Sequence, residues 1–254
     1  GQAPSVVANG RVTDVGLGAA RTVLDWSSFN LAADQTVVYR FDDRGWIVLN
    51  RVSGQAVIDG QIEALVGAQR NAGNVWFSAP GGVIFGANAR VNVGGLLATT
   101  GALALPGFLD AANTRFSIAG AGAPGVQVRG GAELKTGGGA IALIASTVTT
   151  EASARVTAGG TALYGAASDV TVRFAPLQGD LDLVDFIVPA GGGTASAPPL
   201  TLRGDTVAGG VILAVVSRTD VASAVISAPG LLAAQSALAD RGDIVLSSGV
   251  DIIN

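Results

Sequence analysis

The sequence contains no cysteine, no histidine and no methionine among its 254 residues. Without cysteine the chain forms no disulfide, no thiolate zinc site and no cysteine nucleophile. Without histidine it cannot build a Ser-His-Asp triad, and almost every transition-metal site is excluded. We therefore expect no cofactor and no bound metal. The lack of cross-links also suits a chain that crosses a membrane unfolded through a narrow pore.

Charge is scarce as well. Charged residues make up 13% of the chain, the formal net charge is −4, and the 15 basic residues are spread singly. A nucleic-acid or anionic membrane surface requires a basic stripe, so we expect neither as a partner. No stretch of 18 apolar residues runs without polar interruption, which predicts that the chain has no transmembrane helix.

Residues that favour helices are nearly absent, since Glu occurs three times and Lys once. Only residues 57–66 and 231–239 have a pattern that suits a helix. Elsewhere short strands are broken by Gly, Asn, Asp or Pro. Hydrophobic residues make up 49% of the chain and aromatic residues only 5%, so the core must consist of Val, Ile, Leu and Ala.

The middle and the end of the chain repeat themselves. Residues 133–138 resemble residues 155–160, about 22 positions later, and a double glycine before an apolar run occurs at 138–144 and again at 209–215. A period in the low twenties indicates a solenoid. The pattern lacks the regularly spaced Leu and Asn of leucine-rich repeats and the longer period of helical repeats. It fits a parallel β-helix, in which each coil consists of short strands joined by turns. At about 22 residues per coil the chain would make roughly eleven coils.

Pro- and Gly-rich stretches interrupt this rhythm at residues 121–125 and 189–199. The second reads as an excursion between coils, because strand patterns resume on both sides, and a linker is the alternative.

Residues 46–100 carry a family resemblance. They contain the blocks Trp46–Val52, Ile58–Gly60, Gly73–Gly86 and Ala89–Thr100. This region resembles the N-terminal secretion domain of two-partner-secreted proteins, the filamentous-haemagglutinin family. The Asn-Arg-Val block, an Asn-Pro-Asn-Gly-like turn, the Phe-Gly step and the Val-Asn-Val-Gly-Gly-Leu run follow that family's order and approximate spacing. A weaker likeness extends over about residues 20–254, with residues 108–118 where the family has an extra hairpin.

The resemblance implies an all-β fold, a right-handed parallel β-helix with an N-terminal cap and extra-helical hairpins. We expect one β-helical domain over 1–254, with a secretion-domain-like part over about 1–120 and further coils over about 121–254. It also implies export through the periplasm to the bacterial cell surface or beyond. The partner would be an outer-membrane barrel transporter whose periplasmic domains recognise the N-terminal region.

Seven residues are candidates for the family's secretion motifs: Asn50, Arg51, Val52, Ser78, Ala79, Pro80 and Gly81. The turn departs from the family pattern, which usually has Asn-Pro-Asn before Gly. Here Pro80 stands one place later and both asparagines are missing. The departure leaves the turn's contact with a transporter open, although its role in shaping the chain can persist.

Three acidic residues, Asp180, Asp182 and Asp185, lie within six positions. Clustered carboxylates serve acid–base chemistry in polysaccharide-cleaving β-helices, and they also bind calcium. The simpler interpretation is a solvated strand face, since Asp180 and Asp182 alternate along a strand. Asp42 and Asp43 precede Gly45 and indicate a turn.

The tripeptide Arg-Gly-Asp occurs twice, as Arg203, Gly204, Asp205 and as Arg241, Gly242, Asp243. An exposed loop of this kind can engage host integrins. The simpler interpretation is ordinary turn chemistry in a glycine-rich solenoid.

Other polar and aromatic residues admit structural roles. Asn92 is expected as a buried turn residue that bonds backbone groups, whereas for Asn50 this role and a role in secretion stay open. Aromatic residues gather toward the N-terminal part, where they could plug the open end of the first coil or form a sugar-stacking platform; they are Trp26, Trp46, Trp76, Phe77 and Phe85.

The leading hypothesis is therefore an exported surface protein whose β-helical region mediates secretion and forms part of an adhesin, with a host or surface glycan or protein as ligand. It is not expected to be an enzyme. The alternatives are a filament subunit that self-associates through coil edges and a β-helical polysaccharide-active enzyme.

Overall fold

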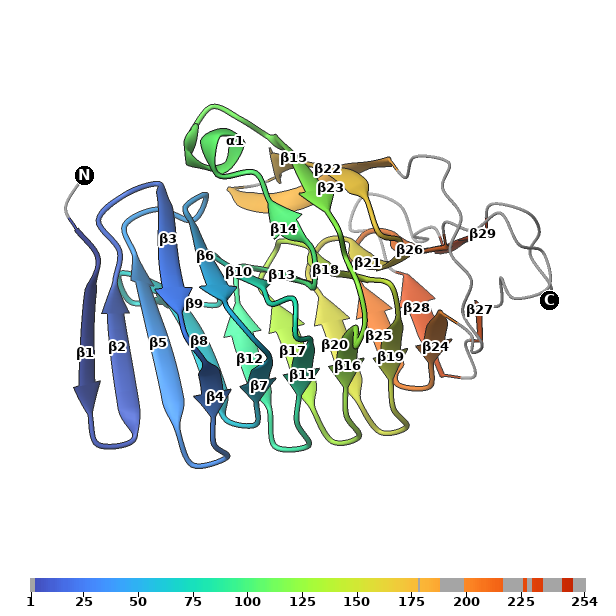
Figure 1. The fold of residues 1–254 in the computed structure, drawn as a ribbon, viewed down its shortest axis with the longest axis horizontal. Helices are drawn as coiled ribbons and strands as arrows, with labels where there is room; N and C mark the ends of the chain where they lie inside the picture. Colours follow the sequence, from blue (N-terminus) through green and yellow to red (C-terminus); the bar gives the residue numbers. More distant parts are fainter. Residues whose placement is uncertain are drawn as a thin grey trace.

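A computed structural model describes residues 3–177, 179–187, 199–216, 226–227, 230–234 and 244–248. The chain winds as a parallel β-helix in which three long sheets run side by side along the axis (Figure 1). We call these sheets A, B and C. A smaller antiparallel sheet, sheet D, lies outside the coils. The predicted parallel β-helix is confirmed.

The three long sheets take one strand from nearly every coil. Sheet A consists of β1 (Ser5–Asn9), β2 (Val12–Gly16), β5 (Thr36–Phe41), β8 (Gln61–Val66), β9 (Gln69–Arg70), β12 (Arg90–Val93), β17 (Glu133–Thr136), β20 (Arg155–Ala158), β25 (Asp205–Ala208) and β28 (Leu232–Ala234). Sheet B consists of β3 (Arg21–Trp26), β6 (Ile47–Val52), β10 (Asn74–Ser78), β13 (Gly95–Thr99), β18 (Ile141–Ala145), β21 (Ala162–Ala166), β26 (Ile212–Val216) and β29 (Ile244–Ser248). Sheet C consists of β4 (Phe29–Leu31), β7 (Ala56–Ile58), β11 (Val83–Phe85), β16 (Val126–Val128), β19 (Val148–Thr150), β24 (Leu200–Leu202) and β27 (Ile226–Ser227).

The register confirms the period that the sequence predicted for the middle of the chain, since Glu133 pairs with Arg155, 22 residues later. Sheet B nevertheless has eight strands within the described residues, fewer than the eleven coils expected. One reason is that the first coils are longer, because Arg21 pairs with Ile47 and Ile47 pairs with Asn74. The other is that the chain leaves the coils twice to build sheet D.

The prediction of a helix at residues 57–66 and at residues 231–239 is wrong wherever the structure describes these residues. Residues 57–58 belong to β7 and residues 61–66 to β8, and burial alternates in both strands, so that Ile58 and Ile62 point inward. Residues 232–234 form β28, and residues 235–239 lie outside the described part. Strand pairing with the coils before and after overrides the weak helical pattern. The only helix in the described residues is the five-residue α1 (Leu105–Leu109), and none is long enough to cross a membrane.

The N-terminal end is capped by an antiparallel hairpin. β1 pairs with β2 in antiparallel fashion, and β2 then continues sheet A in parallel with β5. All five residues of β1 are exposed. The predicted N-terminal cap is therefore present.

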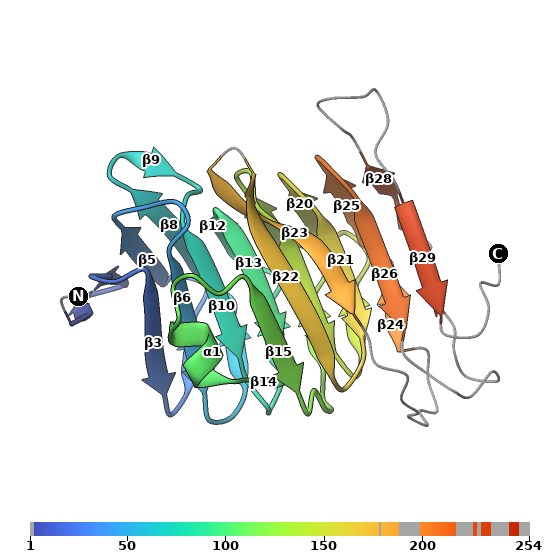
Figure 2. The ribbon, with the colours of Figure 1, turned by 90° about the horizontal axis from the view of Figure 1, so that it is seen from above.

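Sheet D forms the extra-helical part and consists of β14 (Ala102–Leu103), β15 (Arg115–Ala119), β22 (Val170–Leu177) and β23 (Asp180–Ile187). Figure 2 shows β15, β22 and β23 lying across sheet B, with α1 beside them. The expected excursion at residues 108–118 is thus confirmed, although Phe108 lies in α1 and not in a strand. Of the predicted excursion at 189–199, residues 189–198 lie outside the described part.

The structure has two apolar cores. The inner core fills the coils, and the outer core lies between sheet B and sheet D. Strands β10, β13, β18 and β21 are therefore buried on both faces. This explains why their sequences are almost continuously apolar, where a strand with one solvated face would alternate.

The double glycines lie at the corners where the chain passes from sheet A to sheet B. Gly138 and Gly139 stand between β17 and β18, and Gly159 and Gly160 between β20 and β21. A Cβ at Gly159 would overlap the backbone of Gly137 in the preceding coil. The corners thus lack side chains because successive coils stack there at backbone distance.

The three sheets run past residue 120 without a break. The division of the domain into a secretion-domain-like part and further coils stays a prediction.

Candidate functional site

The two segments that resemble secretion motifs lie side by side. β6 and β10 are neighbours in sheet B, with Asn50 opposite Phe77 and Arg51 opposite Ser78. Residues from separate parts of the sequence thus form one continuous strip across two coils. β3 borders the strip on its other side, where Asp25 pairs with Arg51.

Asn50 is fully buried in the inner core and makes three hydrogen bonds. Its Oδ1 accepts from the Trp26 indole Nε1 at 3.0 Å and from the Tyr39 hydroxyl at 2.8 Å. Its Nδ2 donates to the backbone oxygen of Trp76 at 3.2 Å. The expectation of a turn residue is therefore wrong, because Asn50 lies within β6 and mainly serves two aromatic side chains. Asn92 was also expected in a buried turn, but it lies partly exposed in β12.

Burial raises the pKa of the Tyr39 hydroxyl, and its hydrogen bond to Asn50 lowers that pKa by a smaller amount. The hydroxyl therefore stays protonated and acts as a donor. Asn50 consequently receives two hydrogen bonds at one oxygen, which is within the capacity of a carbonyl.

Arg51 and Val52 point to opposite faces of β6. Val52 belongs to the inner core. Arg51 makes an ion pair with Asp25, with 2.7 Å between Arg51 Nη2 and Asp25 Oδ1. Both side chains are substantially exposed, so this ion pair contributes little to stability.

The turn after β10 is a tight connection to sheet C. Gly82 N donates to Ala79 O at 2.9 Å, and Gly82 has a φ of +104°. A Cβ at Gly81 would lie 2.6 Å from Gln55 N in the preceding coil. Ser78 is buried and donates to Gly101 O at 2.7 Å, and Ala79 is fully buried. Only Pro80 and Gly81 of this motif are accessible.

The predicted aromatic plug exists in part. Trp26 stacks edge-on against Phe29 and Phe29 against Phe77, with ring centroids 5.4 Å and 5.1 Å apart. A pocket of about 200 Å³ opens beside them at the N-terminal end, lined by Trp26, Phe29 and Val37 together with Arg11, Asn30 and Gln35. Phe29 was missed because an isolated aromatic residue carries no pattern.

Trp76 was wrongly expected to belong to this plug. It faces outward from sheet B, is 1% exposed, and contacts three phenylalanines of the outer core. Its burial also excludes a sugar-stacking role for this side chain. The reason is sheet D, whose arrival over sheet B no local pattern indicated.

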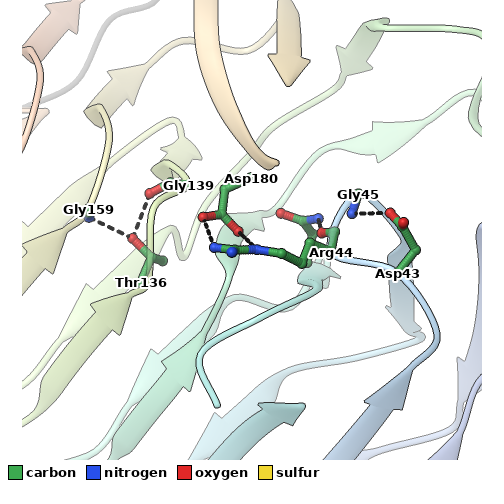
Figure 3. A network of polar contacts seen from close by, with 8 residues as sticks. Asp43, Arg44, Gly45, Thr136, Gly139, Gly159 and Asp180 are labelled. Carbon is green, nitrogen blue, oxygen red and sulfur yellow. Dashed lines mark hydrogen bonds and ion pairs between the residues drawn. The ribbon is translucent and has the colours of Figure 1, made fainter. Parts of the chain in front are cut away.

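Two of the three clustered aspartates are structural. Asp180 is 3% exposed and makes a bidentate ion pair with Arg44, with 3.0 Å between Arg44 Nε and Asp180 Oδ1 (Figure 3). Asp182 Oδ1 accepts from the backbone amides of Thr161 at 2.7 Å and Leu183 at 2.8 Å. Desolvation raises the pKa of Asp182, and the hydrogen bonds from Thr161 and Leu183 oppose that shift. The expected solvated strand face is therefore wrong for these two residues.

Asp185 has different partners. Its Oδ2 lies 3.7 Å from Arg115 Nη2 and 3.9 Å from Arg173 Nε. Within the described residues, no three acidic side chains converge in a way that could hold a metal ion. Asp43 behaves as predicted for a turn, since its Oδ1 accepts from Gly45 N at 2.7 Å.

The described Arg-Gly-Asp tripeptide is a corner of the coil. Gly204 is buried, and a Cβ there would lie 2.8 Å from Ala154 O. Asp205 opens β25 and accepts from Leu231 N at 3.3 Å. This geometry fits turn chemistry at the described corner. The second tripeptide, Arg241, Gly242 and Asp243, lies outside the described residues.

Comparison with known families gives a match that covers almost the whole chain. The model of the TPS secretion domain matches residues 2–254.

Two curated relatives are about one-third identical to this chain within a short aligned segment. Both are heme/hemopexin-binding proteins of Haemophilus influenzae, one 34% identical over 79 residues and the other 32% identical over 83 residues. The matches cover 31% and 33% of this chain. Each spans only 8% of the relative's length.

Among solved structures, the secretion domain of HMW1 from Haemophilus influenzae has a similar fold. The TM-score is 0.65, and the match covers 84% of this chain and 53% of the other. The two sequences are 20% identical over it, so this likeness shows the fold.

Proposed function

Since this chain belongs to the TPS secretion domains, which mediate the export of two-partner-secreted proteins, we propose that the transporter reads residues 50–52 and 78–81 before the fold closes. The family implies export through the periplasm and an outer-membrane transporter as partner. The finer proposal concerns which residues are recognised and in which state of the chain.

Burial is the observation that carries this proposal. Asn50, Val52, Ser78 and Ala79 are between 0% and 7% exposed in the folded domain. A partner that contacts the folded domain therefore reaches little of either motif. In the unfolded chain the same side chains are accessible, and folding then buries them. Recognition would thus end as the domain folds.

The ion pair of Arg51 with Asp25 allows a matched test. Arg51 lies inside the first motif, whereas Asp25 comes near it only in the folded domain. Arg51→Ala and Asp25→Ala both remove the same exposed ion pair and should change stability equally little. The measurement is the amount of chain released by cells that also produce an outer-membrane barrel transporter of the two-partner type.

If the unfolded motif is recognised, Arg51→Ala lowers release and Asp25→Ala does not. Equal losses for both variants would instead indicate recognition of the folded surface. Release at the level of the unmodified chain for both would show that Arg51 plays no part in recognition.

We further propose that the domain itself has no enzymatic role. Asp180, Asp182 and Asp185 are each engaged by neighbouring groups, as an ion pair or as acceptors of backbone amides. Asp180 and Asp182 are also only 3% and 7% exposed, so a sugar substrate cannot reach them as the pair of carboxylates that glycoside hydrolysis requires. An adhesin role for the exported protein, and self-association through coil edges, stay proposals that the domain's fold permits.

The relatives are named for heme binding, but this chain has no accessible side chain that could bind heme iron. Heme iron is held by His, Cys, Met or Tyr side chains. The first three are absent here, and both tyrosines are fully buried. We infer that any such activity of a longer protein would use residues outside this segment.

A further inference from the structure

The outer face of sheet B carries a large apolar surface that the coils themselves do not cover. Ile47, Leu49, Trp76 and Leu97 point away from the inner core, yet none is more than 1% exposed. Their cover comes from α1 and sheet D, in which Phe116 and Phe174 lie 5.0 Å and 5.2 Å from Trp76, centroid to centroid.

This cover depends on a segment far along the chain. The strand order of sheet D is β14, β15, β22, β23, and β14 has only two residues. β15 therefore finds its main partner in β22, whose Val172 lies opposite Phe116. A two-stranded sheet of β14 and β15 would not be stable alone, so β15 needs β22 and β23 to hold its place.

An ion pair ties this distant segment to the first coils. Asp180, at the start of β23, receives two contacts from the guanidinium of Arg44, 136 residues earlier (Figure 3). The Arg44 corner is itself fixed, because Asn74 Nδ2 donates to Arg44 O at 2.8 Å and Trp46 O at 2.9 Å. Asp180 is thus anchored to the corner between β5 and β6, which the Asn74 side chain holds by hydrogen bonds.

The glycine corners complete the docking site. A Cβ at Gly138 would overlap Asp180 Oδ2, and one at Gly160 would overlap Asp182 Oδ1. Between them, Leu181 O accepts a hydrogen bond from Ala140 N at 3.1 Å. Residues 180–182 therefore lie along corners of successive coils that have no side chains to obstruct them.

We propose that β22 and β23 are a closing segment whose docking completes the fold of the first coils. Until it docks, the apolar outer face of β6, β10 and β13 stays open to solvent, and these strands exchange between paired and unpaired states. In a chain exported N-terminus first, the first coils would stay open until residue 187 has emerged. This delay would prolong the state in which we propose the motifs are recognised.

The test is native-state hydrogen exchange on the purified 254-residue chain. Asp180→Ala should raise the exchange rates of amides in β6 and β10 by about tenfold or more, since breaking a largely buried ion pair is costly. Asp185→Ala is the matched control, because it removes a carboxylate of the same strand that faces only sheet D. It should leave β6 and β10 unchanged.

An increase confined to β22 and β23 in Asp180→Ala would overturn the proposal, because the hairpin would then be an appendage. So would unchanged exchange throughout. If Asp180→Ala does not fold, Asp180→Asn keeps the side-chain volume and is judged by the same outcomes. No transporter takes part in this experiment, so its result and that of the release assay are independent.

Discussion

The Tyr39 hydroxyl donates a hydrogen bond to Asn50 Oδ1 at 2.8 Å inside the apolar core of the first coils. Trp26 donates its indole N–H to the same oxygen. Asn50→Ala removes the acceptor and leaves both donors without this partner. Each orphaned donor costs about 1–3 kcal/mol, so together we expect them to lower the free energy of unfolding by about 2–6 kcal/mol. Equilibrium unfolding in urea measures this loss.

Asn92→Ala is the control for this variant. Asn92 also lies in a strand but is partly exposed on the outer face of sheet A. Its replacement should change the free energy of unfolding by no more than about 0.5 kcal/mol. A similar effect of the two substitutions would contradict the role assigned to Asn50.

Residue periodicity was sufficient to predict the type of solenoid and the coil length in the middle of the chain, but not the number of coils. The 22-residue offset between 133–138 and 155–160 became the pairing of Glu133 with Arg155. Such repeats are visible because each coil must place small and apolar residues at the same positions in order to stack. The motif segments could also be found, since Asn50 and Ser78 belong to blocks with a recognisable order.

The contacts of sheet D could not be predicted from local patterns. Arg44 and Asp180 are 136 residues apart, and nothing in the sequence near either residue points to the other. Trp76 sits in a continuous apolar run that suits burial on both faces, but the run does not say what covers the outer face. For the same reason Asp180 looked like a solvated residue when it is in fact an anchored one.

Gly138→Ala should destabilise the domain because the new methyl group overlaps Asp180 Oδ2. Gly138 does not have a positive φ, so the effect comes from packing and not from backbone strain. Overpacking of this kind costs about 1–3 kcal/mol. Gly54→Ala is the control, since a Cβ there meets no atom within 4 Å. Thermal unfolding of the two variants should separate them, and equal midpoints would argue against the docking of Asp180 at this corner.

A row of alternating charges on sheet A should support the register of the coils. Arg90, Glu133, Arg155 and Asp205 are successive partners, and Arg90 Nε lies 3.8 Å from Glu133 Oε2. Glu133→Arg places three like charges in a row and should cost about 0.5–1 kcal/mol at low salt.

Added salt should shrink the loss in Glu133→Arg, because these charges are exposed and screening weakens their repulsion. Lys135→Glu reverses a charge in the same strand between the uncharged Asn92 and Thr157. It should have almost no effect in urea unfolding at either salt concentration. A salt-independent loss in Glu133→Arg would mean that repulsion is not its cause.

Asp182 and Asp59 should affect the pH dependence of stability in opposite directions. Desolvation raises the pKa of Asp182, so the folded state holds its proton more tightly than the unfolded state does. Its contribution to stability therefore falls as pH rises from about 4, the unfolded value, through the raised folded pKa. Hydrogen bonds from the backbone and side chain of Asn88 lower the pKa of Asp59, whose contribution to stability is present above the unfolded pKa and is lost as pH falls through the folded one.

Relative to the unmodified chain, Asp182→Asn should thus gain stability as pH rises from about 3 to about 7, whereas Asp59→Asn should lose it. Urea unfolding across this range measures both differences, and because all other carboxylates are shared, two curves that move in the same direction would contradict the environments described for these aspartates.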